Sequence, residues 1–277
     1  MEREEFLFAV IHYLWFVLTK LRKSLYKNLA KPFFIGKEVV FVPSCHSTND
    51  IASELLKNDV AHEGTIVITD KQTDGRGQLG NRWESQQEMN LTFSIILKPS
   101  LLAIKDHFML NVISSLAICD FIAKFLPNKV KVKWPNDVYV GDEKIAGILT
   151  SNTVRSSQIE STVIGVGLNV NQVEFEVDNA TSLKLATGQH FSLGECLESL
   201  VLAFEKRYFQ LFRNNAYHQL IEDYESNLYW NRELHTFSRK GHLFSGTIQG
   251  INPIGQLHVE TDEGDEFFNF KEIAFIR

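Results

Sequence analysis

The hydrophobic positions of the chain recur with two different periods, and each period predicts one kind of element. Short runs rich in β-branched and aromatic residues indicate strands. They lie at residues 37–42, 65–69, 90–97, 129–134 and 160–170. Apolar residues at helical spacing predict core helices over residues 101–126, 193–212 and 217–227. The 277 residues are enough for one large domain, or for one large and one small domain.

An apolar stretch over residues 6–18 stands apart from this pattern, because only His12 interrupts it. It is too short to span a membrane. Acidic residues crowd its N-terminal side, where a secretory signal has a basic region. Its helical spacing favours an amphipathic helix that docks on the protein body, or a start assigned upstream of the true one. A helix on a membrane surface, with five basic residues behind it, is the alternative.

The C-terminal part of the chain has a different pattern of predicted elements. From about residue 230 onward, short β runs alternate with frequent turns, which predicts a small β-barrel. We therefore divide the chain into an N-terminal extension (residues 1–36), a main domain (37–229) and a C-terminal barrel (230–277). No internal repeat or low-complexity segment is visible.

Composition and charge limit the classes of function that the protein can have. Hydrophobic residues make up 44% of the chain, so a sizeable core can form. The net charge of −6 argues against general nucleic-acid binding, which favours a basic surface. The three cysteines, Cys45, Cys119 and Cys196, are far apart and show no metal-ligand spacing. Their odd number indicates reduced thiols in a cytoplasmic protein.

A glycine-rich loop over residues 71–85 (KQTDGRGQLGNRWES) is the first candidate for chemistry. Its glycines, which permit close approach of a ligand to the backbone, are Gly75, Gly77 and Gly80. Arg76 and Arg82 can pair with phosphate or carboxylate, and Trp83 offers a flat apolar face. The loop therefore predicts a site for a small anionic or nucleotide ligand. A glycine-rich surface connection without a ligand is the alternative.

A second stretch, residues 132–150 (VKWPNDVYVGDEKIAGILT), predicts a turn followed by a hairpin. The strand stops at Pro135, and a returning strand follows the turn at Gly141. This arrangement brings four polar residues near one turn system: Lys133, Asn136, Asp137 and Lys144.

The segment SCHSTND predicts the start of a helix. Ser47 or Thr48 can cap a helix that begins near Asn49. Asp50 stands three residues after Ser47, in a capping arrangement.

The motifs GRGxxGxxW, KWPND and KxAGIL, in this order and spacing, resemble those of biotin protein ligases, also called biotin–[acetyl-CoA carboxylase] ligases. The resemblance runs from about residue 37 to the C-terminus. It implies an α+β fold of the class II synthetase-like (biotin–lipoate ligase) type, with helices on a mixed sheet and a small SH3-like C-terminal barrel. The 36 residues before it are too few for the winged helix-turn-helix of bifunctional members. We therefore expect a monofunctional enzyme without a DNA-binding domain or repressor activity.

Members of this family activate biotin with ATP, giving biotinyl-5′-AMP and pyrophosphate. A lysine of a biotin carboxyl carrier protein then takes the biotin, and AMP leaves. The resemblance thus implies biotin and ATP as substrates, Mg²⁺ as the ion and the carrier protein as partner. A cytoplasmic location is expected, without nucleic acid or firm membrane association. A homodimer is left open.

The resemblance also assigns roles to single residues. The biotin-binding positions that it implies are Ser47, Thr48, Asn49, Gln72, Gly75, Arg76, Gly77, Gln78, Lys144 and Gly147. The ATP-binding positions are Arg76, Trp83, Lys133, Asn136, Asp137, Lys144 and Asn169. Catalytic roles fall on Arg76, Asp137 and Lys144, and Asp137 is also the candidate ligand for Mg²⁺.

Two loop positions depart from the best-known form of the family motif, GRGRxxR. Gln78 and Asn81 stand where that form has arginines, so we expect the adenylate to be held less tightly. Two other functions are kept as alternatives. A lipoate–protein ligase shares the fold and the adenylate chemistry, but the pairing of GRG with KWPND argues against it. A non-catalytic biotin-binding regulatory protein is disfavoured because Lys144 and Asp137 are intact.

Overall fold

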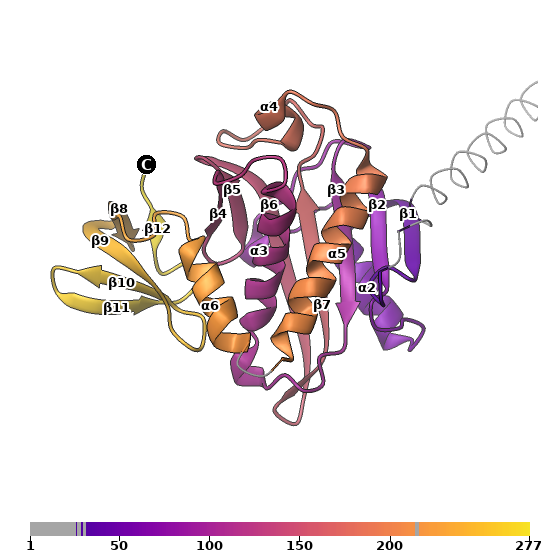
Figure 1. The fold of residues 1–277 in the computed structure, drawn as a ribbon, viewed down its shortest axis with the longest axis horizontal. Helices are drawn as coiled ribbons and strands as arrows, with labels where there is room; N and C mark the ends of the chain where they lie inside the picture. The colour runs from indigo at the N-terminus through magenta and orange to yellow at the C-terminus, as the bar shows by residue number, and fades with distance from the viewer. Residues whose placement is uncertain (1–25, 27–28, 30–31, 214–215) are drawn as a thin grey trace, which may run out of the picture.

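A computed structural model describes residues 26, 29, 32–213 and 216–277, so the helix expected at residues 6–18 lies outside the described part. Seven strands form one mixed sheet in the order β1-β2-β3-β7-β6-β5-β4 (Figure 1). They are β1 (Val39–Cys45), β2 (Ile66–Gln72), β3 (Leu91–Leu97), β4 (Val130–Lys133), β5 (Asp137–Val140), β6 (Glu143–Arg155) and β7 (Gln158–Leu168). Among the pairings of these seven strands, β1 with β2 is parallel and the other five are antiparallel.

Three helices cover one face of this sheet: α3 (Met109–Ile122), α5 (Leu193–Leu211) and α6 (Ala216–Ser226) (Figure 1). In α3 every residue except Asp120 is buried. A helix that is apolar all round belongs in the interior, and α3 lies between α6 and α5 and contacts the sheet through β4, β5 and β6. The short helix α4 (Leu183–Thr187) follows β7.

On the opposite face of the sheet, the described part of the chain places one α-helix, α2 (Thr48–Lys57). It buries Ala52 against Val67, Ile96 and Val163, which come from β2, β3 and β7. This apolar patch ends on β7. Farther along, the same face carries Gly147 on β6 and Gly165 and Gly167 on β7, and side chains from Trp83 and Asn49 lie over them.

The C-terminal strands form a second sheet, antiparallel throughout, in the order β11-β10-β9-β8-β12 (yellow in Figure 1). They are β8 (Leu234–Arg239), β9 (His242–Ile251), β10 (Leu257–Thr261), β11 (Gly264–Phe268) and β12 (Ala274–Phe275). This sheet is of the SH3-like kind that the sequence predicted. It is held to the main body by Glu225 of α6, which accepts a bond from the Ile251 amide at 2.9 Å. The Trp134 indole also donates to the Gly255 carbonyl, at 2.9 Å.

The strands and helices that the sequence predicted within residues 37–277 are present, with shifted ends. The core helix predicted for residues 101–126 begins only at Met109. The residues before it pair with the β6–β7 hairpin instead: the Ile104 amide donates to Ser157, and the Ile159 amide donates to Leu102. These bonds occupy backbone groups that a longer helix would need.

The N-terminal end of α2 also differs from the prediction. Ser47 holds the N-cap position, but its side chain makes no capping bond, and the helix begins at Thr48. The Thr48 amide donates instead to the side-chain oxygen of Gln72, at 2.9 Å. A tertiary contact has thus replaced the local cap.

No helix among the described residues is long and apolar enough to cross a membrane. All three cysteines are free. Burial raises the pKa of the Cys119 thiol to about 12, with a smaller contribution from Asp120, in agreement with a packing role.

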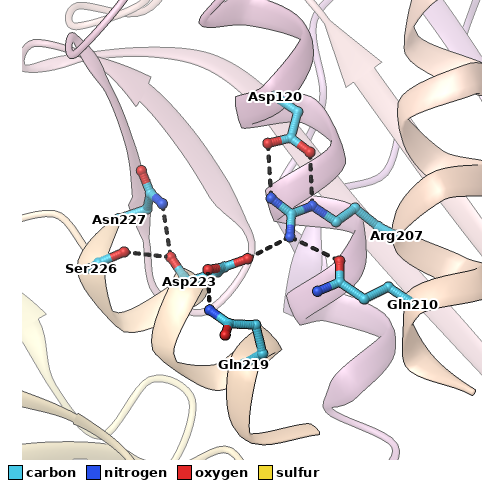
Figure 2. A network of polar contacts seen from close by, with 7 residues as sticks. All are labelled: Asp120, Arg207, Gln210, Gln219, Asp223, Ser226 and Asn227. Carbon is cyan, nitrogen blue, oxygen red and sulfur yellow. Dashed lines mark hydrogen bonds and ion pairs between the residues drawn. The ribbon is translucent and has the colours of Figure 1, made fainter. Parts of the chain in front are cut away.

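An ion-pair network ties the three helices of the covered face together (Figure 2). Arg207 of α5 holds Asp120 of α3 through two bonds of 2.7 and 2.9 Å. Its remaining nitrogen reaches Asp223 of α6 at 2.6 Å. Only 11% of the Arg207 side chain is exposed, so water screens these pairs weakly.

We expect Arg207→Ala to lower the free energy of unfolding by about 2–4 kcal/mol, because two partly buried carboxylates lose their partner. Arg155→Ala is the matched control. Its pair with Glu160 lies on the surface, where 79% of the arginine side chain is exposed. That control should change the free energy by less than about 0.5 kcal/mol. Urea denaturation measures both, and equal effects would contradict the structural role of the network.

Candidate functional site

A cleft of about 360 Å³ opens on the uncovered face of the large sheet. Its walls come from the start of α2, the glycine loop, the β5–β6 hairpin and the segment between β11 and the C-terminus. Thirteen of the fifteen residues to which the sequence assigned a binding or catalytic role line it: Ser47, Thr48, Asn49, Gln72, Arg76, Gly77, Gln78, Trp83, Lys133, Asn136, Asp137, Lys144 and Gly147. Asn81 and Arg82 of the glycine loop line it as well.

One end of the cleft is built where β1 and β2 stop. The two strands run parallel, and Cys45 lies opposite Gln72 at their carboxyl ends. The sequence predicted that β1 ends at residue 42, but pairing with β2 carries it on to Cys45. Because of this extension, the chain enters α2 beside Gln72. Both Thr48 and Asn49 are buried there and face the cleft.

The floor of the cleft consists of glycines on neighbouring strands. Gly147 of β6 lies directly opposite Gly167 of β7. The indole of Trp83 rests on this pair, and a Cβ atom on Gly167 would lie well inside contact distance of the ring. The indole Nε1 of Trp83 is buried and has no partner among the described residues. A glycine pair is thus what lets a large ring lie flat on the sheet.

The glycine loop is itself a narrow hairpin. Arg76 and Arg82 form a β-bridge, and the Gly77 amide donates to Asn81 at 2.7 Å. The Trp83 amide donates to Gly75 at 2.8 Å. Gly75 does not line the cleft. A Cβ atom there would collide with the Trp83 carbonyl, so glycine is required for the hairpin to close.

The guanidinium of Arg76 is held by a carboxylate that the sequence did not single out as a partner. Its two terminal nitrogens contact the two oxygens of Asp50 on α2, at 3.1 and 2.9 Å. About half of each side chain is exposed, so the pair contributes little to stability. It does orient the guanidinium at the cleft wall.

A second pair of opposite charges lies across the floor. Lys144 Nζ is 2.7 Å from Asp137 Oδ1, and it lies over the Trp83 ring. Nearby, Lys133 lies over the rings of Tyr139 and Phe275. Burial lowers the pKa of Lys133, Asp137 opposes that shift, and the positive charges of Arg277 and Lys144 add to it.

Asn169 lies behind the cleft, outside its lining. It is buried, and its side chain donates to the Thr181 carbonyl at 3.0 Å. The Thr181 amide in turn donates to Lys144, whose own amide donates to Asn179. In the structure, Asn169 therefore supports the strand segment that carries Lys144.

Several residues in the cleft lining or directly behind it escaped the sequence reasoning. Ser94 and Thr92 stand at alternate positions of a strand that is otherwise apolar, and this period-two polar pattern was the available signal. The barrel also contributes to the lining, through Phe270, Lys271, Ile273, Ala274 and Phe275. Nothing local in the sequence marks those residues, because only domain packing brings them to the cleft.

The cleft thus combines neutral donors and acceptors at the start of α2 with two cations, Arg76 and Lys144, that carboxylates orient. Such a site suits an uncharged polar ring attached to an anionic group. Among the described residues there is no cluster of three metal-ligating side chains. Of the acidic residues named here, only Asp137 lies on the lining.

Comparison with known proteins gives a consistent picture. The model of the Biotin/lipoate A/B protein ligase family matches residues 41–169. The bifunctional ligase/repressor BirA of Bacillus subtilis is 32% identical over 252 residues, covering 88% of this chain and 76% of that protein. A biotin–[acetyl-CoA-carboxylase] ligase of Mycobacterium tuberculosis is 34% identical over 125 residues, covering 44% and 45%.

The fold has solved counterparts. A biotin protein ligase from Aquifex aeolicus, in complex with biotin and ATP, superposes with a TM-score of 0.72 at 26% identity. The match covers 87% of this chain and 99% of that one.

The position of the Trp83 ring over Gly147 and Gly167 leads to a prediction. We expect Gly167→Ala to displace the indole, because the added methyl group would occupy the space of the ring. Acrylamide quenching of tryptophan fluorescence should then increase, while the far-UV circular dichroism spectrum stays the same. The comparison of Trp83→Phe with the Gly167→Ala, Trp83→Phe double variant isolates the signal. If quenching rises equally in that background, the change does not come from Trp83.

Proposed function

The chain belongs to the Biotin/lipoate A/B protein ligase family, and we infer that it is a biotin protein ligase that forms biotinyl-5′-AMP from biotin and ATP. The biotin is then transferred to a lysine of an acceptor protein. The single observation that carries this inference is that one cleft contains both a neutral polar group of side chains and a charged pair. Neutral polar side chains at the start of α2 face the Lys144–Asp137 pair across a glycine floor.

The polar end suits the urea ring of biotin. A cyclic urea is neutral and offers both N–H donors and a carbonyl acceptor, so it needs hydroxyl and amide partners. Ser47, Thr48, Asn49 and Gln72 supply these, and all four line the cleft. Gly147, on the floor, lets the Trp83 ring and the end of the Lys144 side chain come close to the sheet.

The charged end suits the reacting groups. In the first step a carboxylate oxygen of biotin bonds to the α-phosphorus of ATP, and pyrophosphate leaves. Lys144 and Arg76 stabilise the negative charge that gathers there. In the second step the acceptor amine bonds to the acyl carbon, loses a proton, and AMP leaves. Holding the reactants together accounts for much of the rate, so no covalent enzyme intermediate is required.

Mg²⁺ is part of the proposal, with Asp137 as its protein ligand. Mg²⁺ keeps several waters and typically takes one or two carboxylates plus phosphate oxygens, so a single carboxylate fits this chemistry. Trp83, Lys133 and Asn136 lie on the lining where the nucleotide would bind. Asn169 would act through Lys144, from behind the cleft.

For the acceptor we propose the biotin carboxyl carrier domain of acetyl-CoA carboxylase, on the strength of the Mycobacterium relative. Lipoate is the competing substrate within the family. It lacks the urea ring, so it leaves the polar end of the cleft unpaired. A lipoate ligase would support exchange of pyrophosphate into ATP with lipoate, and this enzyme should do so only with biotin.

The test of function uses that exchange reaction. Wild-type protein should exchange labelled pyrophosphate into ATP when biotin is present, and Lys144→Ala should lose about a hundredfold or more of the rate. Lys129→Ala, which removes an exposed lysine just before β4, is the matched control and should keep the full rate. Near-normal exchange by a folded Lys144→Ala protein would refute the role of Lys144. No biotin-dependent exchange by the wild type would refute the function.

The loop generates a second test. Gln78 lies on the cleft lining. In the proposed function, an arginine at this position would contact the adenylate phosphate. A charge-assisted bond contributes about 1–3 kcal/mol, so Gln78→Arg should slow the release of biotinyl-5′-AMP by about fivefold or more. Gln87→Arg adds the same charge at an exposed residue outside the cleft lining and should leave release unchanged. The measurement is the dissociation rate, with hydrogen exchange over residues 71–85 to follow loop closure. Equal release from Gln78→Arg and wild type would contradict the proposal.

A further inference from the structure

Ser94 is fully buried on β3, directly beneath the start of α2. Its hydroxyl oxygen lies 2.7 Å from the Thr48 hydroxyl and 2.6 Å from the side-chain oxygen of Asn49. Both neighbours line the cleft, whereas Ser94 itself does not. A single buried hydroxyl thus touches two residues of the polar end.

The geometry of Asn49 fixes the direction of the hydrogen bonds. Its side chain crosses the row of paired residues Ser94, Gly165 and Leu149 on three neighbouring strands. Its Nδ2 donates to the Leu149 carbonyl at 3.2 Å, so its oxygen must be the atom that faces Ser94. Gly165 is required beneath it, because a Cβ atom there would overlap the amide.

The number of hydroxyl protons then determines whether Thr48 donates or accepts. An amide oxygen can only accept, so Ser94 donates its single proton to Asn49. The 2.7 Å contact between Ser94 and Thr48 needs a proton as well, and Thr48 must supply it. The other possible acceptor for that proton, Gln72 Oε1, is farther away at 3.5 Å.

We propose that Ser94 is a positioning residue that makes the Thr48 hydroxyl a hydrogen-bond acceptor toward the cleft. The chain of bonds runs from Thr48 to Ser94 to Asn49 to the Leu149 carbonyl. With its only proton committed, Thr48 presents lone pairs and so selects an N–H donor. Gln72 has the opposite polarity: its oxygen accepts from the Thr48 amide, which leaves its Nε2 as a donor.

This inference rests on the proposed function, in which the ligand is biotin. It states which side chains accept from and donate to the urea ring. An acceptor and a donor lie side by side, as the N–H and carbonyl of a cyclic urea require. A hydroxyl that could rotate freely would accept or donate and would therefore pair less selectively. It would also lose its rotational freedom on binding, which costs free energy.

The experiment measures biotin binding by calorimetry without ATP. Ser94→Ala should raise the Kd for biotin by about tenfold, while the KM for ATP in the exchange reaction changes by less than about twofold. Ser114→Ala is the matched control. Ser114 is equally buried, but it bonds only the Leu110 carbonyl of its own helix, on the covered face. Its loss should leave the Kd for biotin unchanged.

A double-mutant cycle separates positioning from general packing. In a Thr48→Val background the effect of Ser94→Ala on the Kd should shrink at least about threefold, because Thr48 carries most of it. An undiminished effect would overturn the proposal, as would a Ser94→Ala protein that binds biotin like the wild type. Should Ser94→Ala fail to fold, Ser94→Cys keeps the volume with a weaker donor and should give an intermediate Kd. A wild type that does not bind biotin would instead refute the proposed function.

Discussion

The parallel pairing of β1 with β2 is the constraint on which the site depends. It ends both strands at the same edge of the sheet, with Cys45 opposite Gln72. From there one chain segment turns into α2 and the other into the glycine loop. Successive side chains of a strand point to opposite faces, so a shift of one residue would move Gln72 away from the Thr48 amide. One register therefore sets the place of two motifs that are distant in sequence.

The second requirement is an absence of side chains. Gly147, Gly165 and Gly167 lie on two neighbouring strands, at and just beyond the start of α2. Asn49 crosses the sheet over Gly165, and Trp83 rests over Gly147 and Gly167. The cleft thus owes its shape to small residues, and its chemistry to the polar groups that enter the space they leave.

Two cations of the cleft are oriented by carboxylates of the chain itself. Arg76 is paired with Asp50, and Lys144 with Asp137. The backbone of Lys144 is fixed as well, through the segment that Asn169 supports. Groups held in place in this way need little reorganisation when negative charge develops next to them.

The sequence by itself determined the elements of the fold and the chemical nature of the site. Periodicity located the strands and helices, because local spacing reflects which face of an element is buried. The motifs located Arg76, Asp137 and Lys144, because residue type and order carry that information. Tertiary structure alone decided the contacts between them. The local cap expected at Ser47 gave way to Gln72, and Asn169 lies behind the cleft instead of in its lining. Ser94 and the barrel residue Phe275 were not foreseen, since their positions depend on strand register and domain packing, which act over distances in sequence that no local pattern records.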